Sequence, residues 1–577
     1  MKKLLRTSVL VLAFLVLASV SVLMCACGTK NEEKTFACEF KMVQNGEAQE
    51  LLVSWDTAEE LSEVNIVVRH GNDVVGNYTI NDQAVLQQNK TTVYAYYGKH
   101  TVEVTAKTKN NKISQDTKEV MLSAEEYNFA PLSGSMPVLL FTLMSIDEQG
   151  LPDVFSREVP TFVWFERVGA WDWKQLPENI YPLPTATEEE YTTRVSTTEI
   201  IFNRTNAYIK ELASINPDSK FNLLINDFDA GQFLNIIVAN QLKNYTCTFL
   251  SDGSHSYNMI NKTFNVENAT EKYEQMLESY QETKQQVATR GSYPYAGSGF
   301  TVNYWSFQPY IFLLAAEEAN TTWVMPRFRK DYHVSLPNDK SNFVENKIFV
   351  GGGNNTISSI KEYAIATALT NIQNNPDKEK IETLKTLYKF NDDMFAKANE
   401  EGKKVMMILG SHATDTPEAN FVEYVNFVKQ YYGDEYVYYY KGHPNSPTNQ
   451  YPTRAQLISD LGLIDIESTI AAELILFFFP DISMSGYASS TFDSIVEQEM
   501  ACVYFGTTKA AALADANIKN GAMFDAYIAP IASHGSTYSE YATEEGHVYY
   551  VVEFNDNNAE NYNFAIYDST TNELKYY

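Results

Sequence analysis

The chain has 577 residues, of which 44% are hydrophobic and 20% charged, a composition typical of folded globular proteins rather than disordered ones. This length favours two to four domains. The formal net charge of −29 argues against a nucleic-acid partner, because phosphate backbones require a basic protein surface.

The N-terminus is typical of a bacterial lipoprotein. A short basic segment precedes an apolar run at 8–24, and the run ends in "MCACG". Cys27 stands between a small Ala26 and a glycine, as in a lipobox, where the cysteine is lipidated after cleavage. We therefore predict a signal peptide at 1–27, a polar tether at 28–35 and a lipid-anchored chain at the bacterial cell surface. An uncleaved signal anchor is the alternative.

Cysteine and histidine usage gives no support to a disulfide framework or a metal site. Beyond the signal region the sequence contains only Cys38, Cys247 and Cys502, which are far apart and odd in number. The eight histidines include neither an HExxH motif nor a closely spaced pair.

Residues 36–125 are predicted to form an immunoglobulin-like β-sandwich. Short segments rich in β-branched and aromatic residues follow one another here, separated by turn signals such as "GND" and "KNNK". The predicted strands are "ELLVSW", "VNIVVRH", "DVVGNYTI", "TTVYAYY" and "HTVEVTAKT". We expect Trp55 in the core of this sandwich.

Residues 130–300 alternate between strand and helix patterns. Continuous apolar runs, "MPVLLFTLM" and "PTFVWFERV", predict strands that are buried on both faces. Helices are predicted at 196–215, 231–244 and 269–290, and strands at 220–227 and 245–250. Strand, helix and strand in succession indicate a doubly wound parallel sheet.

The pattern restarts in residues 301–544 and predicts a second doubly wound domain. Strands are predicted at 403–410, 435–440 and 500–506, and helices at 420–432, 454–461 and 468–479. The glycines of "FVGGGNN" lack dinucleotide-loop spacing, so we interpret that segment as a turn. We expect 545–577 to have no core of its own and to join the 130–300 domain.

Three polar segments directly follow predicted strands, where ligands of doubly wound sheets bind. They are "INDFDAG" with Asp227 and Asp229, "LSDGS" with Asp252, and "KGHP". Taken singly, each has a simpler interpretation as a turn or helix cap.

Together these segments suit transfer from a nucleotide-sugar donor. "KGHP" supplies a cation and an imidazole, and the paired hydroxyls of Ser489 and Ser490 precede a predicted helix that favours an anion. Asp252 supplies a carboxylate that can take a proton from an attacking hydroxyl while the phosphate leaves.

The segment from Tyr436 to Phe492, "YYYKGHPNSP…AELILFFFPDISMSGYASSTF", resembles a known family in both order and spacing of motifs. It is similar to the bacterial sialyltransferases of the Photobacterium and Pasteurella type, glycosyltransferase family 80. These carry a D-D/E-G, a K-G-H-P and a Ser-Ser motif in that order. The resemblance implies a GT-B fold of two Rossmann-like domains, with 130–300 on the acceptor side and 301–544 on the donor side.

The resemblance also implies an activity and its residues. The reaction would be an inverting transfer of sialic acid from CMP-sialic acid to a galactose-type hydroxyl on a glycan, without metal or other cofactor. His443 would act on the leaving phosphate. The implied donor contacts are Lys441, Gly442, His443, Pro444, Glu473, Ser489 and Ser490.

The sequence departs from the family pattern at two places. Ser251 stands where the family has its catalytic acid, so Asp252, Asp227 or Asp229 must serve as base, or the chain is weak or inactive. The segment at 410–412, Gly410, Ser411 and His412, is a possible donor loop but lacks the family's tryptophan. The alternatives are another CMP-sugar-dependent transferase, or a catalytically degenerate glycan-binding surface lipoprotein.

Overall fold

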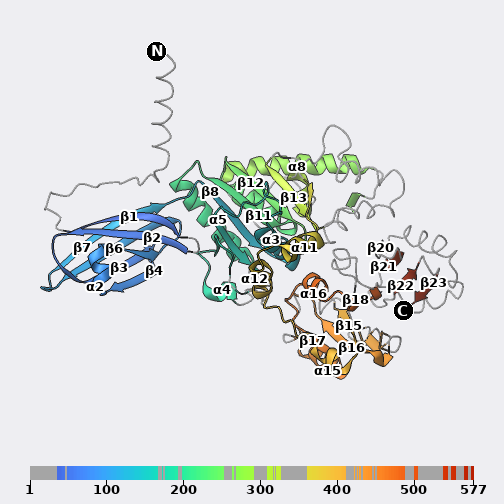
Figure 1. The fold of residues 1–577 in the computed structure, drawn as a ribbon. Helices are drawn as coiled ribbons and strands as arrows, with labels where there is room; N and C mark the ends of the chain where they lie inside the picture. Colours follow the sequence, from blue (N-terminus) through green and yellow to red (C-terminus); the bar gives the residue numbers. More distant parts are fainter. Residues whose placement is uncertain are drawn as a thin grey trace, which may run out of the picture. The chain divides into compact units, whose positions relative to one another are not determined.

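The computed structural model divides the chain into two compact units (Figure 1). The first unit takes in the chain up to Glu125 together with Ala207–Ser219, and the second takes in Glu126–Asn206 and Lys220–Tyr577. The structure describes residues 36–45, 48–166, 172, 176–192, 198–252, 263–264, 268–291, 308–315, 318, 320–326, 360–410, 421–422, 425–426, 428–429, 433–444, 448, 451–487, 500–504, 537–542, 548–553, 564–568 and 573–576.

Several predictions fall outside these residues. They are the signal peptide with Cys27, the tether at 28–35, the "FVGGGNN" segment, Ser411, His412, Ser489 and Ser490. Within the described part of the chain, no helix combines the length and the apolar character needed to cross a membrane.

The first unit contains two antiparallel sheets, and each predicted strand is present in them. One sheet has the order β1 (Phe36–Asn45), β2 (Ala48–Thr57), β5 (Lys90–Tyr94). The other has the order β4 (Asp73–Ile80), β3 (Leu61–His70), β6 (Gly98–Thr108), β7 (Ile113–Leu122). A short helix, α2 (Gln83–Gln88), precedes β5.

Alternating burial in these strands gives the first unit its core. Every second residue of β6 is buried, which is the period of two expected of a strand with one face in a core. Trp55 is buried, as predicted. The antiparallel strands are therefore confirmed, while the immunoglobulin-like class stays a prediction.

The first parallel sheet of the second unit has seven strands. Its order is β10 (Ile180–Pro182), β9 (Thr161–Phe165), β8 (Glu126–Leu132), β11 (Lys220–Asn226), β12 (Tyr245–Leu250), β13 (Thr321–Met325), β14 (Ile360–Glu362). All neighbouring pairs run parallel, so the prediction of a doubly wound sheet is confirmed.

The "MPVLLFTLM" run is a helix, not the strand that we predicted. α3 (Ser135–Ile146) is buried from Met136 to Ile146, so its apolar residues lie on every side. Such a run carries no periodicity, and a buried helix and a buried strand then look alike in sequence. The strand at this place is β8, which precedes the run.

The other helices of this part largely agree with prediction. α4 (Glu188–Thr192) and α5 (Thr198–Ile215) precede β11, and α8 (Ala269–Arg290) has the predicted bounds. The helix predicted at 231–244 is shorter, with η1 (Asp227–Asp229) and α6 (Gly231–Phe233) leading into the π-helical turn η2 (Leu234–Val238). η4 (Gln308–Tyr310) and α9 (Ile311–Ala315) precede β13.

The second parallel sheet has the order β17 (Ile464–Ile466), β16 (Tyr436–Lys441), β15 (Lys404–Leu409), β18 (Ser483–Tyr487), β19 (Met500–Tyr504). α13 (Ala396–Glu401) precedes β15, η7 (Gly433–Glu435) precedes β16, and α15 (Pro452–Asp460) and α16 (Ala472–Phe478) follow it. The described residues Phe421, Val425 and Val428 are fully buried against this sheet, as the predicted helix face requires.

Two predicted boundaries differ from the structure. The first sheet continues past residue 301 to β14, and α11 (Ile365–Asn374) and α12 (Glu379–Leu387) then contact α3. The C-terminal stretch forms a separate antiparallel sheet, with the order β20 (Thr537–Ala542), β21 (Val548–Glu553), β22 (Phe564–Asp568), β23 (Glu573–Tyr576). β22 contacts β19 of the second parallel sheet, so the expected return to the first sheet is wrong.

One apolar cluster brings α3 and α16 together. It contains most of α3, residues of α11 and α12, and Ala471 and Leu474 at the start of α16. Because both helices belong to the same core, the N-terminal ends of α3 and α16 are held near each other, and the candidate site lies there.

Candidate functional site

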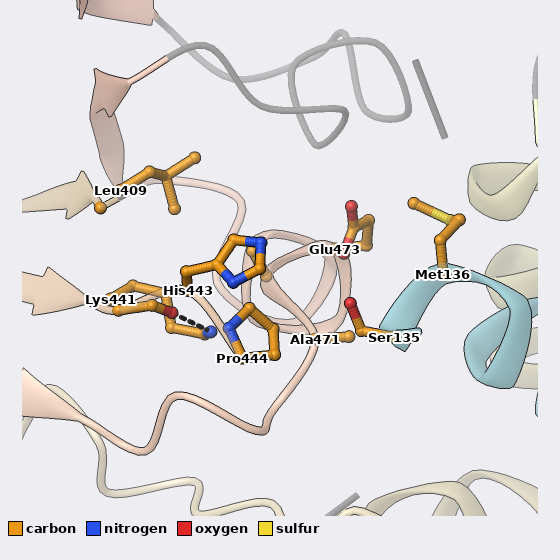
Figure 2. Close-up of a pocket in the computed structure, with 11 residues that line it drawn as sticks. Ser135, Met136, Leu409, Lys441, His443, Pro444, Ala471 and Glu473 are labelled. Atoms are coloured by element: carbon orange, nitrogen blue, oxygen red, sulfur yellow. Dashed lines mark hydrogen bonds between the residues drawn. The ribbon is translucent and has the colours of Figure 1, made fainter. Parts of the chain in front are cut away.

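The candidate site is a pocket where the second parallel sheet meets the N-terminal ends of α3 and α16 (Figure 2). Its lining residues are Ser135, Met136, Leu409, Gly410, Lys441, Gly442, His443, Pro444, Ala471, Ala472 and Glu473. The "KGHP" segment, Gly410 and Glu473, which lie far apart in sequence, are thus brought to one cavity.

β16 delivers "KGHP" to the pocket. The strand pairs with β15 on one side and β17 on the other, and its last residue is Lys441. The backbone N–H of Gly410 donates to the Lys441 carbonyl at 2.9 Å, which closes the pairing with β15. Gly410 itself is required by close packing, since a Cβ there would overlap the Tyr440 ring, with Cζ 2.7 Å away.

Lys441 is buried rather than extended into the cavity. Only 3% of it is exposed, and its Nζ donates to the carbonyls of Gly442 at 3.0 Å and Ser468 at 2.6 Å (Figure 2). Burial lowers the pKa of Lys441 to about 8, against the opposing effect of Glu473 and two other carboxylates nearby. The ammonium therefore fixes the loop that carries His443, in addition to placing a positive charge beneath the pocket.

His443 and Glu473 both line the pocket. In Figure 2 the His443 ring lies above Pro444, and the Glu473 carboxylate lies between that ring and Met136 in this view. Glu473 is 5% exposed and belongs to the first turn of α16, where the helix dipole favours a negative charge. The pocket thus offers an imidazole and a carboxylate to a polar ligand.

On the first sheet, Asp227 and Asp252 are directly linked. Asp227 follows β11 and is 1% exposed, and Asp252 follows β12. Asp227 Oδ1 accepts the backbone N–H of Asp252 at 3.1 Å, and its Oδ2 accepts the indole N–H of Trp323 at 3.1 Å. Asp227 is therefore engaged with the protein itself.

The Asp252 carboxylate lies against the N-terminal end of α3. A Cβ added to Gly134 would be only 2.6 Å from Asp252 Oδ1, and Gly134 also has a φ of +81° that favours glycine. Its neighbour Ser135 lines the pocket. Asp252 thus contacts the residue that precedes the cavity wall at the start of α3. The sequence signal for this contact is the "SGS" that precedes the apolar run.

The remaining candidate for a base, Asp229, is engaged with the protein itself, and so is Ser251. Asp229 accepts a hydrogen bond from the Ser133 hydroxyl, and Asn226 donates to the Ser133 carbonyl at 2.9 Å, so both belong to a local polar network. Ser251 is fully buried, and its backbone N–H donates to Val324 at 2.9 Å. Asp252 is half-buried, and its carboxylate lies against Gly134, the residue before the pocket-lining Ser135.

Among the described residues, no group of three or more histidine, cysteine or carboxylate side chains could hold a metal ion. Cys38 and Cys247 are both buried and form no disulfide, and burial raises the pKa of Cys247. Neither cysteine lines the pocket.

No family model matches the sequence, and no curated protein matches it. Solved structures that the chain resembles include the 2,6-sialyltransferase of Photobacterium sp. JT-ISH-224 in complex with CMP and lactose, at 14% identity and a TM-score of 0.48, over 79% of this chain and 87% of that one. The sialyltransferase of Photobacterium damsela is similar at 15% identity and a TM-score of 0.44, over 80% and 91% of the two chains.

A third similar structure is the UDP-GlcNAc 2-epimerase of Neisseria meningitidis, at 10% identity and a TM-score of 0.35, over 67% of this chain and 85% of that one. The family whose motifs the sequence resembles is thus represented among the solved structures that the chain is similar to.

Proposed function

We propose that the protein is an inverting glycosyltransferase that moves sialic acid from CMP-sialic acid to a galactoside hydroxyl. The observation that carries the proposal is the single pocket lined by His443, Glu473 and the loop held by Lys441, with Asp252 beside its α3 wall. The motif order and spacing of 436–492 support the choice of a CMP-sugar as donor.

The proposed step uses two half-buried groups. The acceptor hydroxyl attacks the anomeric carbon of the sialyl group while its bond to the phosphate oxygen breaks, and the electron pair of that bond leaves with CMP. The hydroxyl proton passes to the Asp252 carboxylate. His443 donates to the leaving phosphate, and the positive charge of Lys441 stabilises it. Glu473 is proposed to bind the ribose hydroxyls, and Ser489 and Ser490 the phosphate.

One observation favours a second candidate, a degenerate glycan-binding lipoprotein. Ser251 stands in the family's acid position, and it is enclosed in the protein. If Asp252 does not replace that acid, the pocket still binds the nucleotide but no transfer follows.

Donor turnover tests the proposal. The chain from about residue 30 to 577 is incubated with CMP-sialic acid and lactose, and CMP release and sialyl-lactose are followed together. We expect turnover in the wild type, no detectable turnover in His443→Ala and a strong reduction in Asp252→Ala. Asp218→Ala is the matched control, because this exposed carboxylate precedes β11 at the opposite, amino end of the strand.

Full activity in both His443→Ala and Asp252→Ala would contradict the roles proposed for these two residues. CMP binding without turnover of CMP-sialic acid, and of other CMP-sugars, would favour the degenerate glycan-binding protein. Turnover of a different CMP-sugar alone would keep the transferase and change its donor.

We further propose that Cys27 is lipidated and anchors the chain at the bacterial surface. The lipobox-like "CACG" supports this. Mass spectrometry of the chain from membranes is expected to find an N-terminal acylated Cys27, and Cys27→Ser is expected to abolish the modification. An intact signal sequence on the membrane-bound chain would indicate a signal anchor instead.

A further inference from the structure

Asp227 is a buried carboxylate with no part in the proposed chemistry. It is 1% exposed and follows the carboxyl end of β11, next to the end of β12 that Asp252 follows. A buried carboxylate is costly to the fold unless its charge is met by hydrogen bonds. Its location beside the proposed base therefore calls for a physical reason.

The hydrogen bonds of Asp227 tie together the ends of three strands. The carboxylate belongs to the end of β11, Oδ1 accepts from Asp252 after β12, and Oδ2 accepts from Trp323 in β13. Trp323 is fully buried, and its ring lies 4.7 Å from the Phe312 ring. The indole N–H is thus a fixed donor that orients the carboxylate.

β12 leaves the sheet at the residue that Asp227 holds. The backbone N–H of Ser251 still bonds the Val324 carbonyl of β13 at 2.9 Å. One residue later, the N–H of Asp252 donates to Asp227 instead of to a strand. The direction in which the chain leaves β12, and with it the placement of the Asp252 side chain, is set by this bond.

A carboxylate fits this position better than its amide. Asp252 and Trp323 both present N–H donors to the Asp227 carboxylate, one to each oxygen, so each of its oxygens must accept. Asparagine has the same shape but only one accepting oxygen, and its NH₂ would face one of the two donors. The site therefore selects the charged group, although no substrate touches it.

We propose that Asp227 is a positioning residue for the transfer reaction, which holds the backbone of Asp252 so that its carboxylate rests at Gly134 beside the pocket. This inference rests on the proposed function for its catalytic consequence. The anchoring of the Asp252 backbone stands independently of which reaction the pocket performs.

The test compares Asp227→Ala, Asp227→Asn and Trp323→Phe with the wild type, using two readouts. Hydrogen exchange at the Asp252 amide measures the anchor, and steady-state kinetics measure its consequence. For Asp227→Ala, which removes both accepting oxygens, we expect exchange of that amide to be about tenfold faster, which corresponds to one lost hydrogen bond. We expect kcat to fall about 100-fold, as for a misplaced reacting group, with the donor KM within about twofold of the wild type.

Trp323→Phe separates positioning from general loss of structure. It removes one donor but leaves the Asp252 bond, so we expect smaller changes in the same direction. In the double variant we expect kcat no lower than in Asp227→Asn, because the two side chains act through one carboxylate. Exchange in α8 serves as an internal reference, and Asp218→Asn is the matched carboxylate control.

Unchanged exchange at the Asp252 amide in Asp227→Ala would overturn the inference, and so would faster exchange with unchanged kcat. A fall in kcat that merely follows the folded fraction, with faster exchange in α8 as well, would also overturn it. If the wild type turns over no CMP-sugar, the proposed function fails, while the exchange measurement still decides whether Asp227 anchors Asp252.

Discussion

Lys441 and Asp227 occupy comparable places in the two parallel sheets, with opposite charge. Each stands at the carboxyl end of a strand, and they are 3% and 1% exposed. Lys441 donates to two backbone carbonyls, whereas Asp227 accepts from a backbone N–H and an indole N–H. In both cases a buried charge is held by neutral polar groups, and a segment distant in sequence supplies at least one of them, Ser468 for Lys441 and Trp323 for Asp227.

The difference between the two lies in what each charge can do beyond its own bonds. Lys441 lines the pocket, so its charge reaches a ligand as well as fixing the loop of His443. Asp227 lies outside the pocket lining and acts through the backbone of Asp252. In each sheet a buried charge, Lys441 or Asp227, orders a loop. The half-buried neighbour on that loop, His443 or Asp252, is the group proposed to act in the reaction.

Among the changes on the side of Asp227 and Asp252, the largest effect is expected from Asp252→Asn, which keeps the side chain's shape but removes the base. We expect kcat for transfer to lactose to fall about 1,000-fold, within the range for a lost general base. Donor KM should change little, because the "KGHP" side is untouched. Steady-state kinetics with both substrates varied would measure this. A rise in donor KM with an unchanged kcat would place Asp252 on the donor side.

Lys441→Met tests the opposite side of the comparison. We expect donor KM to rise about 30-fold, since a charged hydrogen-bonding group near the phosphate is lost, and kcat to change less. The same kinetic assay with CMP-sialic acid as the varied substrate measures it. Equal losses in kcat for Lys441→Met and Asp227→Asn, with donor KM unchanged in both, would break the proposed division of roles.

The burial of Lys441 also predicts a dependence of stability on pH. Its pKa is about 8 in the folded chain, below its ordinary value of 10.5. Between these values the unfolded chain binds more protons, so the contribution of Lys441 to stability rises with pH across this window, by on the order of 3 kcal/mol in total. Urea unfolding of the wild type and of Lys441→Met at pH 7.5 and 10 measures this contribution. Between the two pH values, the free energy of unfolding should rise more in the wild type than in Lys441→Met.

That difference isolates Lys441 from the buried tyrosines, which titrate at higher pH in both proteins. A wild-type protein that gains no stability relative to Lys441→Met between the two pH values would contradict the burial of the charged amine.

The smallest effect concerns a half-buried charge in the first unit, His70, which has an ionic partner. His70 Nε2 lies 2.9 Å from Glu211 Oε2, and this hydrogen bond raises the pKa of His70. Its contribution to stability is present below about pH 6.5 and is lost as pH rises through the raised value. We expect less than about 1 kcal/mol, seen as the difference between wild type and His70→Gln in urea unfolding at pH 5.5 and 8.

The neighbouring His100 works in the opposite sense. It is fully buried, and burial lowers its pKa to about 4. The fold therefore loses stability as pH falls below about 6.5, because the unfolded chain then binds a proton that the buried imidazole does not. His100 is present in both proteins, so the part of its pKa shift that burial causes, the largest part, cancels in the difference. A difference that grows with rising pH would contradict the His70–Glu211 ion pair.

Strand ends were the part of the site that sequence predicted best. The segment predicted as a strand at 435–440 is β16 (Tyr436–Lys441), and it places "KGHP" at the expected edge. Asp252 likewise follows a strand whose predicted bounds agree with β12. Local pattern suffices for these elements because β-branched and aromatic runs bounded by turn residues have few alternative structures.

The partners of the buried charges could not be predicted from local pattern. Trp323 is 96 positions from Asp227, and Ser468 is 27 positions from Lys441. A lysine after a strand looks the same in sequence whether its amine faces solvent or backbone carbonyls. The helix α3 was also missed, because an entirely apolar run has no face that distinguishes helix from strand.

Titration calorimetry of CMP into the chain from about residue 30 to 577 tests whether the pocket that His443 lines binds the nucleotide of the donor. We expect saturable binding of one CMP by the wild type and a similar affinity in Asp252→Asn. In His443→Ala we expect an affinity at least about tenfold weaker, for the loss of one charge-assisted hydrogen bond. No binding by the wild type, or binding weakened by Asp252→Asn but unaffected by His443→Ala, would contradict it.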